Sequence, residues 1–155
     1  MEIERKFLIS SFPNLHLQEI EKALVKQGYL SIDPEVRIRS KKTSDSIEYV
    51  LCVKGDGTLS REEVECNISE DAFQRLEQML DKPLISKDYR KYKLPGGLFL
   101  ECNRVDAGTP SEFMYAEVEF SSVEQANAFI PPSYLEKEVT EDNQCKMKNY
   151  WKNKK

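Results

Sequence analysis

The sequence predicts an α+β fold whose strands form an antiparallel sheet or barrel. Segments with alternating polar and apolar residues outnumber the helical segments, turn-like stretches separate several of them, and strands and helices do not alternate along the chain. We count seven or eight strands and three or four helices. With 155 residues available, we expect residues 1–155 to form a single domain with its own core.

The first predicted strand covers residues 2–8. Side chains alternate between the two faces of a strand, so Glu2, Glu4 and Lys6 share one face while Phe7 lies on the other. For this segment alone, a charged face turned to water is the simplest interpretation, because antiparallel sheets commonly leave one face solvated.

A helix is predicted over residues 17–30. Ile20 and Leu24 recur near helical spacing, and Gly28 suits the end of a helix. We place the single histidine, His16, at this helix and interpret it as a surface or core residue rather than a catalyst.

The middle of the chain predicts an antiparallel meander followed by another helix. Turn-like segments at 43–46 and 56–59 separate three strands, which cover residues 36–42, 47–55 and 60–68. Ser69 is the expected N-cap of a helix over residues 69–80, whose first turn is acidic.

The last third of the chain begins with a hairpin signal at residues 95–97, where a proline precedes two glycines. The remaining predicted elements are strands over residues 84–94, 98–106 and 113–121 and helices over residues 122–130 and 142–152.

One face of the predicted sheet collects acidic and basic side chains. Four-residue turns in the meander would place Arg37 opposite Cys52 and Lys54 opposite Arg61. The charged face then holds Arg37, Arg39, Lys54, Arg61, Glu63 and Glu65, to which the strand over residues 113–121 adds Glu117 and Glu119. In the later hairpin, a two-residue glycine turn would bring Arg90 opposite Asn103 and onto this face.

The composition of this face favours a ligand over water. A solvated face usually mixes Ser, Thr, Gln and Lys, whereas this one repeats Glu-x-Glu three times and Arg-x-Arg once. Like charges two residues apart along a strand lie only about 6.5 Å apart, so they repel unless counterions occupy the face. A water-facing sheet stays the alternative.

Clustered glutamates without His or Cys form a hard oxygen site suited to Mg²⁺ or Mn²⁺. Clustered arginines and lysines suit phosphate oxygens. Together they predict a site for a metal–polyphosphate complex, in which a metal-activated water attacks the terminal phosphorus and no nucleophilic side chain is needed.

The overall composition argues against several classes of partner and of metal site. The net charge is −4 with a pI near 5.2, which argues against a nucleic-acid partner. No apolar run reaches membrane-spanning length and no signal segment begins the sequence, so we expect a cytoplasmic protein without a membrane partner. The four cysteines have no zinc spacing, so we expect reduced thiols and no soft-metal site.

The motifs resemble, in order and spacing, those of the CYTH superfamily, also called triphosphate tunnel metalloenzymes. They are MEIERKFL, VRIR, VKG, SREEVE, AEVEF and KEVTED. The resemblance implies an eight-stranded antiparallel β-barrel, with a charged tunnel inside and helices packed outside. It also implies metal ligands at Glu2, Glu4, Glu63, Glu117 and Glu119 and a triphosphate clamp made of Lys6, Arg37, Arg39, Lys54, Arg61 and Arg90.

The chain departs from the family pattern at two places. Family members often have a Lys-x-Arg pair where this chain has SKDYRKY, and an acidic residue where this chain has Asn103. The contributions of Glu65, Lys87, Lys91, Glu101, Asn103, Lys146 and Lys148 therefore stay open.

The resemblance makes hydrolysis of inorganic triphosphate to pyrophosphate and phosphate our leading hypothesis, with Glu4, Glu63 and Glu119 as catalytic candidates and a triphosphate-containing small molecule as substrate. The alternatives are class IV adenylate cyclase activity, hydrolysis of thiamine or nucleoside triphosphates, and non-catalytic binding of polyphosphate or nucleotides. A homodimer stays open, as does the choice between Mg²⁺ and Mn²⁺.

Overall fold

The computed structural model describes residues 1–13 and 17–154. Its elements are β1 (Glu2–Leu8), β2 (Glu19–Ser31), β3 (Glu35–Lys42), β4 (Ile47–Lys54), β5 (Ser60–Arg61), β6 (Glu63–Asn67), α1 (Glu70–Glu77), β7 (Ile85–Lys93), β8 (Phe99–Val105), β9 (Phe113–Glu119), α2 (Val123–Ala128), β10 (Lys137–Glu138) and α3 (Met147–Asn153), with short 3₁₀ turns at Pro95–Gly97 and Asn143–Cys145.

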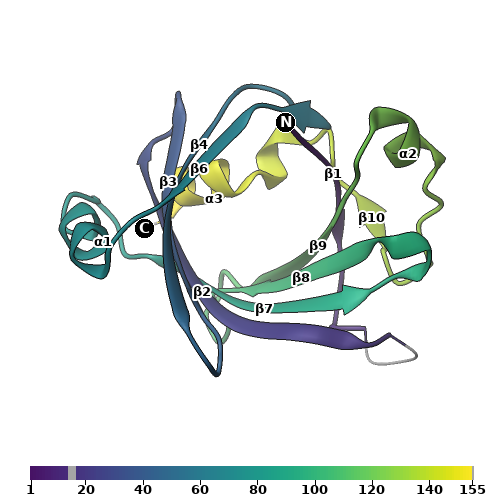
Figure 1. Ribbon diagram of the computed structural model, residues 1–155, viewed down its shortest axis with the longest axis horizontal. Coiled ribbons are helices and arrows are strands. Elements are labelled where there is room, and N and C mark those ends of the chain that lie inside the picture. Colours follow the sequence, from purple (N-terminus) through teal and green to yellow (C-terminus); the bar gives the residue numbers. More distant parts are fainter. Residues whose placement is uncertain (14–16, 155) are drawn as a thin grey trace.

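The strands curve into a nearly closed antiparallel barrel (Figure 1). They follow the order β10-β1-β9-β8-β7-β2-β3-β4-β6. The short strand β5, which precedes β6 in the sequence, pairs with β1 and so links the two ends of this order. Eight strands in the described residues are five residues or longer. The predicted eight-stranded barrel with helices outside is confirmed.

The predicted helix over residues 17–30 is wrong, because most of this segment forms β2. Its burial alternates along the strand: Ala23 and Val25 are buried, whereas Leu24 between them is 43% exposed. β2 pairs with β3 on one edge and with β7 on the other, so its backbone finds partners on both sides. His16 lies outside the described residues.

The meander is confirmed, but the register of its second hairpin differs from the prediction by two residues. Lys54 lies opposite Glu63 instead of Arg61. The loop is longer than predicted, since Gly55 N–H donates to the carbonyl of Glu62 and Arg61 leaves to pair with Glu2 of β1. A shift of two residues keeps every side chain on its predicted face.

The register of the β7–β8 hairpin differs by one residue, and this reverses a predicted face. The turn at Pro95–Gly97 is closed by Leu94 N–H donating to the carbonyl of Leu98, and Gly96 and Gly97 both have positive φ. Arg90 therefore lies opposite Cys102, not Asn103. Because a one-residue shift exchanges the two faces, Arg90 points to the outside of the barrel.

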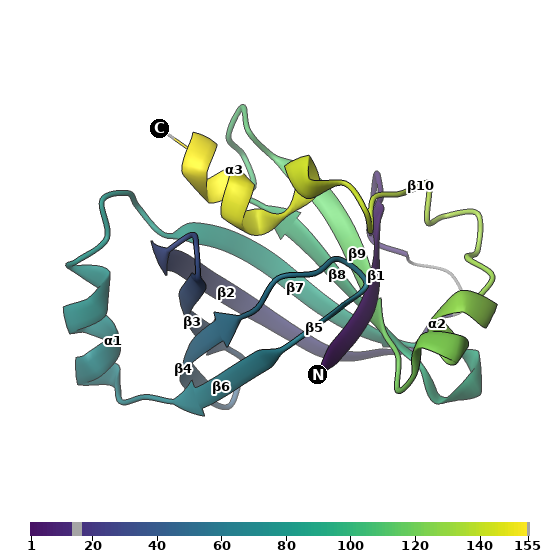
Figure 2. The same cartoon turned by 90° about the horizontal axis from the view of Figure 1, so that it is seen from above.

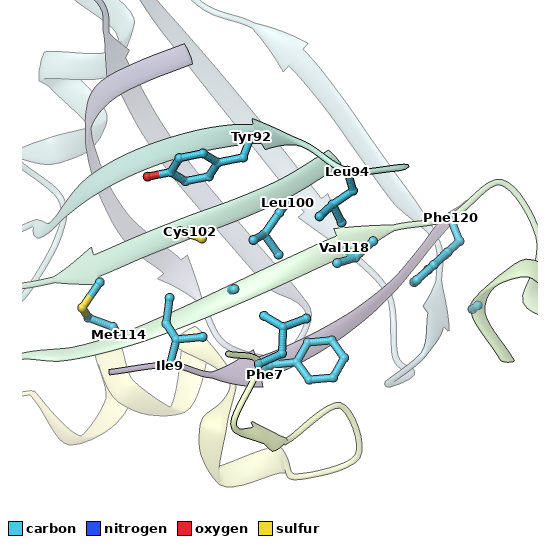
Figure 3. Close-up of a cluster of buried hydrophobic side chains, with 12 residues drawn as sticks. Phe7, Ile9, Tyr92, Leu94, Leu100, Cys102, Met114, Val118 and Phe120 are labelled. Carbon is cyan, nitrogen blue, oxygen red and sulfur yellow. The ribbon is translucent and has the colours of Figure 1, made fainter. Parts of the chain in front are cut away.

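Apolar side chains on the outer surface of β1, β7, β8 and β9 form the main core (Figure 3). Phe7, Leu100 and Val118 lie at its centre and are at most 1% exposed. Phe129, which follows α2, packs edge-to-face against Phe7 and covers part of this face. The main core thus lies between sheet and helix, outside the barrel, and most of the side chains that line the interior are polar or charged.

Two further helices pack against the barrel where they were predicted. Ser69 caps α1 by accepting a hydrogen bond from Ala72 N–H, and Phe73 of α1 packs on Tyr49 of β4 with ring centroids 5.1 Å apart. α3 lies across one end of the barrel (Figure 2), where Trp151 packs on Tyr29. None of the helices in the described residues is long and apolar enough to span a membrane.

Candidate active site

The barrel encloses a cavity of about 240 Å³ whose wall is unusually rich in charge. Nine lining side chains are Lys or Arg and nine are Asp or Glu. They are Lys6, Arg37, Arg39, Lys41, Lys54, Arg61, Lys87, Lys146 and Lys148, together with Glu2, Glu4, Glu35, Glu63, Glu65, Glu101, Glu117, Glu119 and Asp142. Such a wall suits a small, highly charged ligand accompanied by ions of both signs.

Ten of the eleven predicted site residues line this cavity. They are Glu2, Glu4, Glu63, Glu117, Glu119, Lys6, Arg37, Arg39, Lys54 and Arg61. The exception is Arg90, whose guanidinium lies on the outside, 4.0 Å from the ring centre of Phe12 and 3.3 Å from Asp88. We therefore drop Arg90 from the candidate site.

The carboxylates from β1 and β9 lie together because Glu4 pairs with Glu119, and Lys6 with Glu117, across the two strands. Burial and the neighbouring charge of Glu117 raise the pKa of Glu4 well above its ordinary value. Burial opposes ionisation of Glu117 as well, but a hydrogen bond from Glu4 and the charges of the cavity lysines lower its pKa to about 2.

Cations hold the other carboxylates by ion pairs. Lys54 Nζ lies 3.1 Å from Glu2 and 3.3 Å from Glu63, and Arg61 lies 3.3 Å from Glu35. Burial works against the charge of Lys54, as does Arg37, but the nearby glutamates raise its pKa overall. The clamp and the acidic cluster are thus interleaved rather than separated along the barrel.

Two lysines that line the cavity contact the same buried tyrosine. Lys87 Nζ donates to the hydroxyl of Tyr115 at 2.5 Å, and Lys6 Nζ lies 4.2 Å from the centre of the same ring. Lys6 also donates to the carbonyl of Cys145 at 2.5 Å. Burial and the charge of Arg37 lower the pKa of Lys87 well below its ordinary value.

Several residues left open by the sequence are placed by the structure. Glu65, Lys87, Glu101, Asn103, Lys146 and Lys148 line the cavity. The inward-facing residues of β7 that line the cavity are Lys87 and Tyr89. Lys91 is not among the lining residues.

Other lining residues were missed by the sequence prediction. Three of them, Val25, Gln27 and Tyr29, lie on β2. Because a helix was predicted for this segment, the alternation that places these side chains inside the barrel was not recognised. Glu35 comes two residues before Arg37, and extending the alternation of β3 by one step would have found it.

The donors available to a metal are almost all carboxylate oxygens. In addition, Cys52 offers its sulfur within 4.8 Å of oxygens from Glu63 and Glu65. This cluster is the one mixed thiol–carboxylate group among the described residues, and spacing along the sequence did not reveal it.

Comparison with known proteins gives relatives that span nearly the whole chain. The chain is 39% identical over 150 residues to an inorganic triphosphatase of Nitrosomonas europaea, covering 95% of this chain and 94% of that protein. It is 31% identical over 160 residues to an inorganic triphosphatase of Acetivibrio thermocellus, covering 98% and 96%.

Among solved structures, a crystal structure of an inorganic triphosphatase matches with a TM-score of 0.66 and 36% identity, over 97% of this chain and 93% of that one. No protein-family model matches the chain. The relatives, the barrel and its charged interior agree, and the chain therefore belongs to the family of the inorganic triphosphatases, within the CYTH superfamily of triphosphate tunnel enzymes.

Proposed function

We propose that this protein hydrolyses inorganic triphosphate to pyrophosphate and phosphate. The observation that carries this proposal is the cavity of about 240 Å³ inside the barrel, in which carboxylates and cationic side chains are interleaved. Two relatives with 39% and 31% identity are inorganic triphosphatases.

The cationic side chains can bind phosphate oxygens from several strands at once. Arg37 and Arg39 reach the cavity from β3, Lys54 from β4 and Lys87 from β7. Arginine binds phosphate through a planar fork and lysine as a point charge, so this set holds a short chain of phosphates and neutralises its negative charge. The same charges stabilise the negative charge that shifts to the leaving pyrophosphate.

The acidic cluster fits a hard divalent cation, and we propose Mg²⁺ or Mn²⁺. Glu2, Glu4, Glu63, Glu117 and Glu119 would hold it, since carboxylate oxygens are the ligands these ions prefer. Burial and the charge of Glu117 raise the pKa of Glu4, which supports a site where a cation would be favourable beside these carboxylates. When bound, the metal activates water and neutralises phosphate charge.

The protein's own groups then have defined tasks. Buried lysines and arginines orient the phosphates, Tyr115 positions Lys6 and Lys87 through its ring and its hydroxyl, and α3 limits access of water at one end of the barrel. A cytoplasmic location, a homodimer and the identity of the metal stay predictions.

Phosphate release tests the proposal. With triphosphate and Mg²⁺ or Mn²⁺, we expect phosphate and pyrophosphate in equal amounts, and at least a hundredfold loss of kcat/KM in a Glu4→Gln variant, about 2.7 kcal/mol. Lys26→Ala removes an exposed lysine that does not line the cavity and serves as a matched control. Binding of triphosphate without release of phosphate would refute hydrolysis and leave a binding protein, and cyclic AMP formed from ATP would favour a cyclase.

A further inference from the structure

One edge of β6 has no neighbouring strand among the described residues. β6 stands last in the strand order, where it pairs with β4. Ile68 N–H, just after the strand, donates to the carbonyl of Tyr49 on β4. In an antiparallel ladder the direction of the backbone groups alternates from residue to residue. Glu63, Glu65 and Asn67 therefore direct their N–H and C=O groups away from β4, towards the open edge.

The outer face beside this edge is apolar and exposed. Val64 is 66% exposed, and Val53, which lies opposite it on β4, is 38% exposed. On the same face of β6, Cys66 is exposed and Ile68 is half-buried. Figure 2 shows β6 at the lower margin of the molecule. An open strand edge flanked by apolar side chains is where a further strand adds to a sheet.

A second copy of this chain can supply that strand, and charge restricts how the two strands align. Around a two-fold axis, β6 of one copy runs antiparallel to β6 of the other. An axis at Glu65 places this glutamate opposite its own counterpart, and an axis at Val64 places Glu63 opposite Glu65. Like charges directly opposite each other destabilise a sheet, so both alignments are disfavoured.

We propose that two copies of this chain pair antiparallel through β6, with the two-fold axis at Cys66. Glu65 of each copy then lies opposite Asn67 of the other, whose side-chain amide can donate to the carboxylate, and Val64 lies opposite Ile68. The backbone groups of Glu65 and Asn67 that point to the open edge bond across the interface. An axis at Asn67 also avoids the like charges, but it pairs fewer residues of β6. The inference does not depend on the reaction proposed above.

Pairing would hold β6 on both edges, and β6 carries two of the cavity carboxylates. Glu63 lies 3.3 Å from Lys54, and Glu65 lies 3.4 Å from Arg39. β6 has five residues, so the contact is small. Small interfaces are typical of transient complexes, and we therefore expect a dimer that exchanges with monomer at a dissociation constant of about 10 µM.

Sedimentation velocity at protein concentrations from about 1 to about 100 µM tests the pairing. We expect the wild type to shift from monomer to dimer over this range. Val64→Lys should stay monomeric, because it puts an ammonium into the apolar contact. Asn67→Pro should also stay monomeric, since it removes an N–H that points to the open edge, a position where edge strands tolerate proline. Ile130→Lys, at an 86% exposed residue outside β6, is the matched control and should dimerise like the wild type.

Disulfide cross-linking tests the alignment of the two strands. The two Cys66 residues would form a pair without mutual backbone hydrogen bonds, with Cα atoms about 4.5 Å apart, and disulfides span about 4.4–6.8 Å. Diamide takes up the two electrons and two protons that are released when two thiols join. With it, we expect a covalent dimer on a non-reducing gel from the wild type and from Cys145→Ser, and none from Cys66→Ser.

A wild-type protein that stays monomeric over the whole concentration range would overturn the pairing. So would a dimer that persists in both Val64→Lys and Asn67→Pro. Val64→Lys changes an exposed side chain, so its result decides the question even if circular dichroism shows that Asn67→Pro is unfolded. A dimer that diamide does not link through Cys66 would overturn the alignment.

Discussion

Asp106 joins the C-terminal helix to the end of β8, and its replacement by asparagine should destabilise the protein measurably. One carboxylate oxygen accepts a hydrogen bond from Ser86 N–H at 2.9 Å. The other accepts from the hydroxyl of Tyr150 at 2.5 Å and from Lys154 Nζ at 2.9 Å. Asp106 has φ of 46° and is 7% exposed.

Asparagine tolerates positive φ, so Asp106→Asn preserves the backbone and the bond from Ser86 but removes the oxygen shared by Tyr150 and Lys154. A hydrogen bond to a charged group contributes about 1.5–3 kcal/mol. The ammonium of Lys154 regains water and the Tyr150 hydroxyl can accept a bond instead, so we expect a loss of about 2 kcal/mol. For a chain of this size that lowers Tm by about 4–8 °C.

Two measurements detect the effect of Asp106→Asn. Urea unfolding gives the free energy, and the fluorescence of Trp151, the sole tryptophan and part of α3, should shift to the red if the helix loosens. Asp81→Asn replaces an exposed aspartate and is the matched control. A loss below about 0.5 kcal/mol with unchanged emission would refute the role assigned to Asp106.

The stability that Asp106 contributes should depend on pH in a defined direction. Burial works to raise the pKa of Asp106, but the hydrogen bonds from Tyr150, Ser86 and Lys154 lower it overall. The stability from its charge is therefore present above the pKa of an unfolded aspartate and is lost as the pH falls through the lower folded pKa. The difference between wild type and Asp106→Asn should thus be largest near about pH 7 and shrink towards about pH 3.

Three further predictions concern packing, the clamp and the thiols. Gly28→Ala would place a Cβ 2.5 Å from Leu80 Cδ1, and urea unfolding should show a loss of about 1–3 kcal/mol. Arg39→Ala should lower kcat/KM for triphosphate at least tenfold, about 1.4 kcal/mol, while Arg90→Ala stays within twofold, and equal losses would contradict the placement of Arg90 outside the cavity. Cys66 is exposed and should react with a thiol reagent well before the two buried cysteines, which mass spectrometry of the labelled peptides can determine.

Much of the barrel could be predicted because its charged face alternates strictly. Glu2, Glu4 and Lys6 in β1, Arg37 and Arg39 in β3, and Glu117 and Glu119 in β9 stand at every second position and line the cavity, and a period of two indicates a strand. β2 was mistaken for a helix because Ile20 and Leu24 happen to recur at helical spacing. What makes this segment a strand is its pairing with β3 and β7, which are distant in the sequence.

The candidate site could be predicted where the register between neighbouring strands could be predicted. The error of two residues at Lys54 left its face unchanged, whereas the error of one residue at Arg90 exchanged inside for outside. Register depends on turn geometry, and the turn at Pro95–Gly97 uses three residues rather than two. That residues 1–155 form a single domain stays a prediction.

The two-residue strand β5 makes one side of the barrel much weaker than the others. β1 and β5 share two residue pairs, whereas β2 and β7 share eight. Local opening breaks the smallest number of hydrogen bonds first, so the wall should part along this seam while the other strands stay paired. Amide hydrogens of Ser60 and Arg61 should therefore exchange with solvent before those of β2.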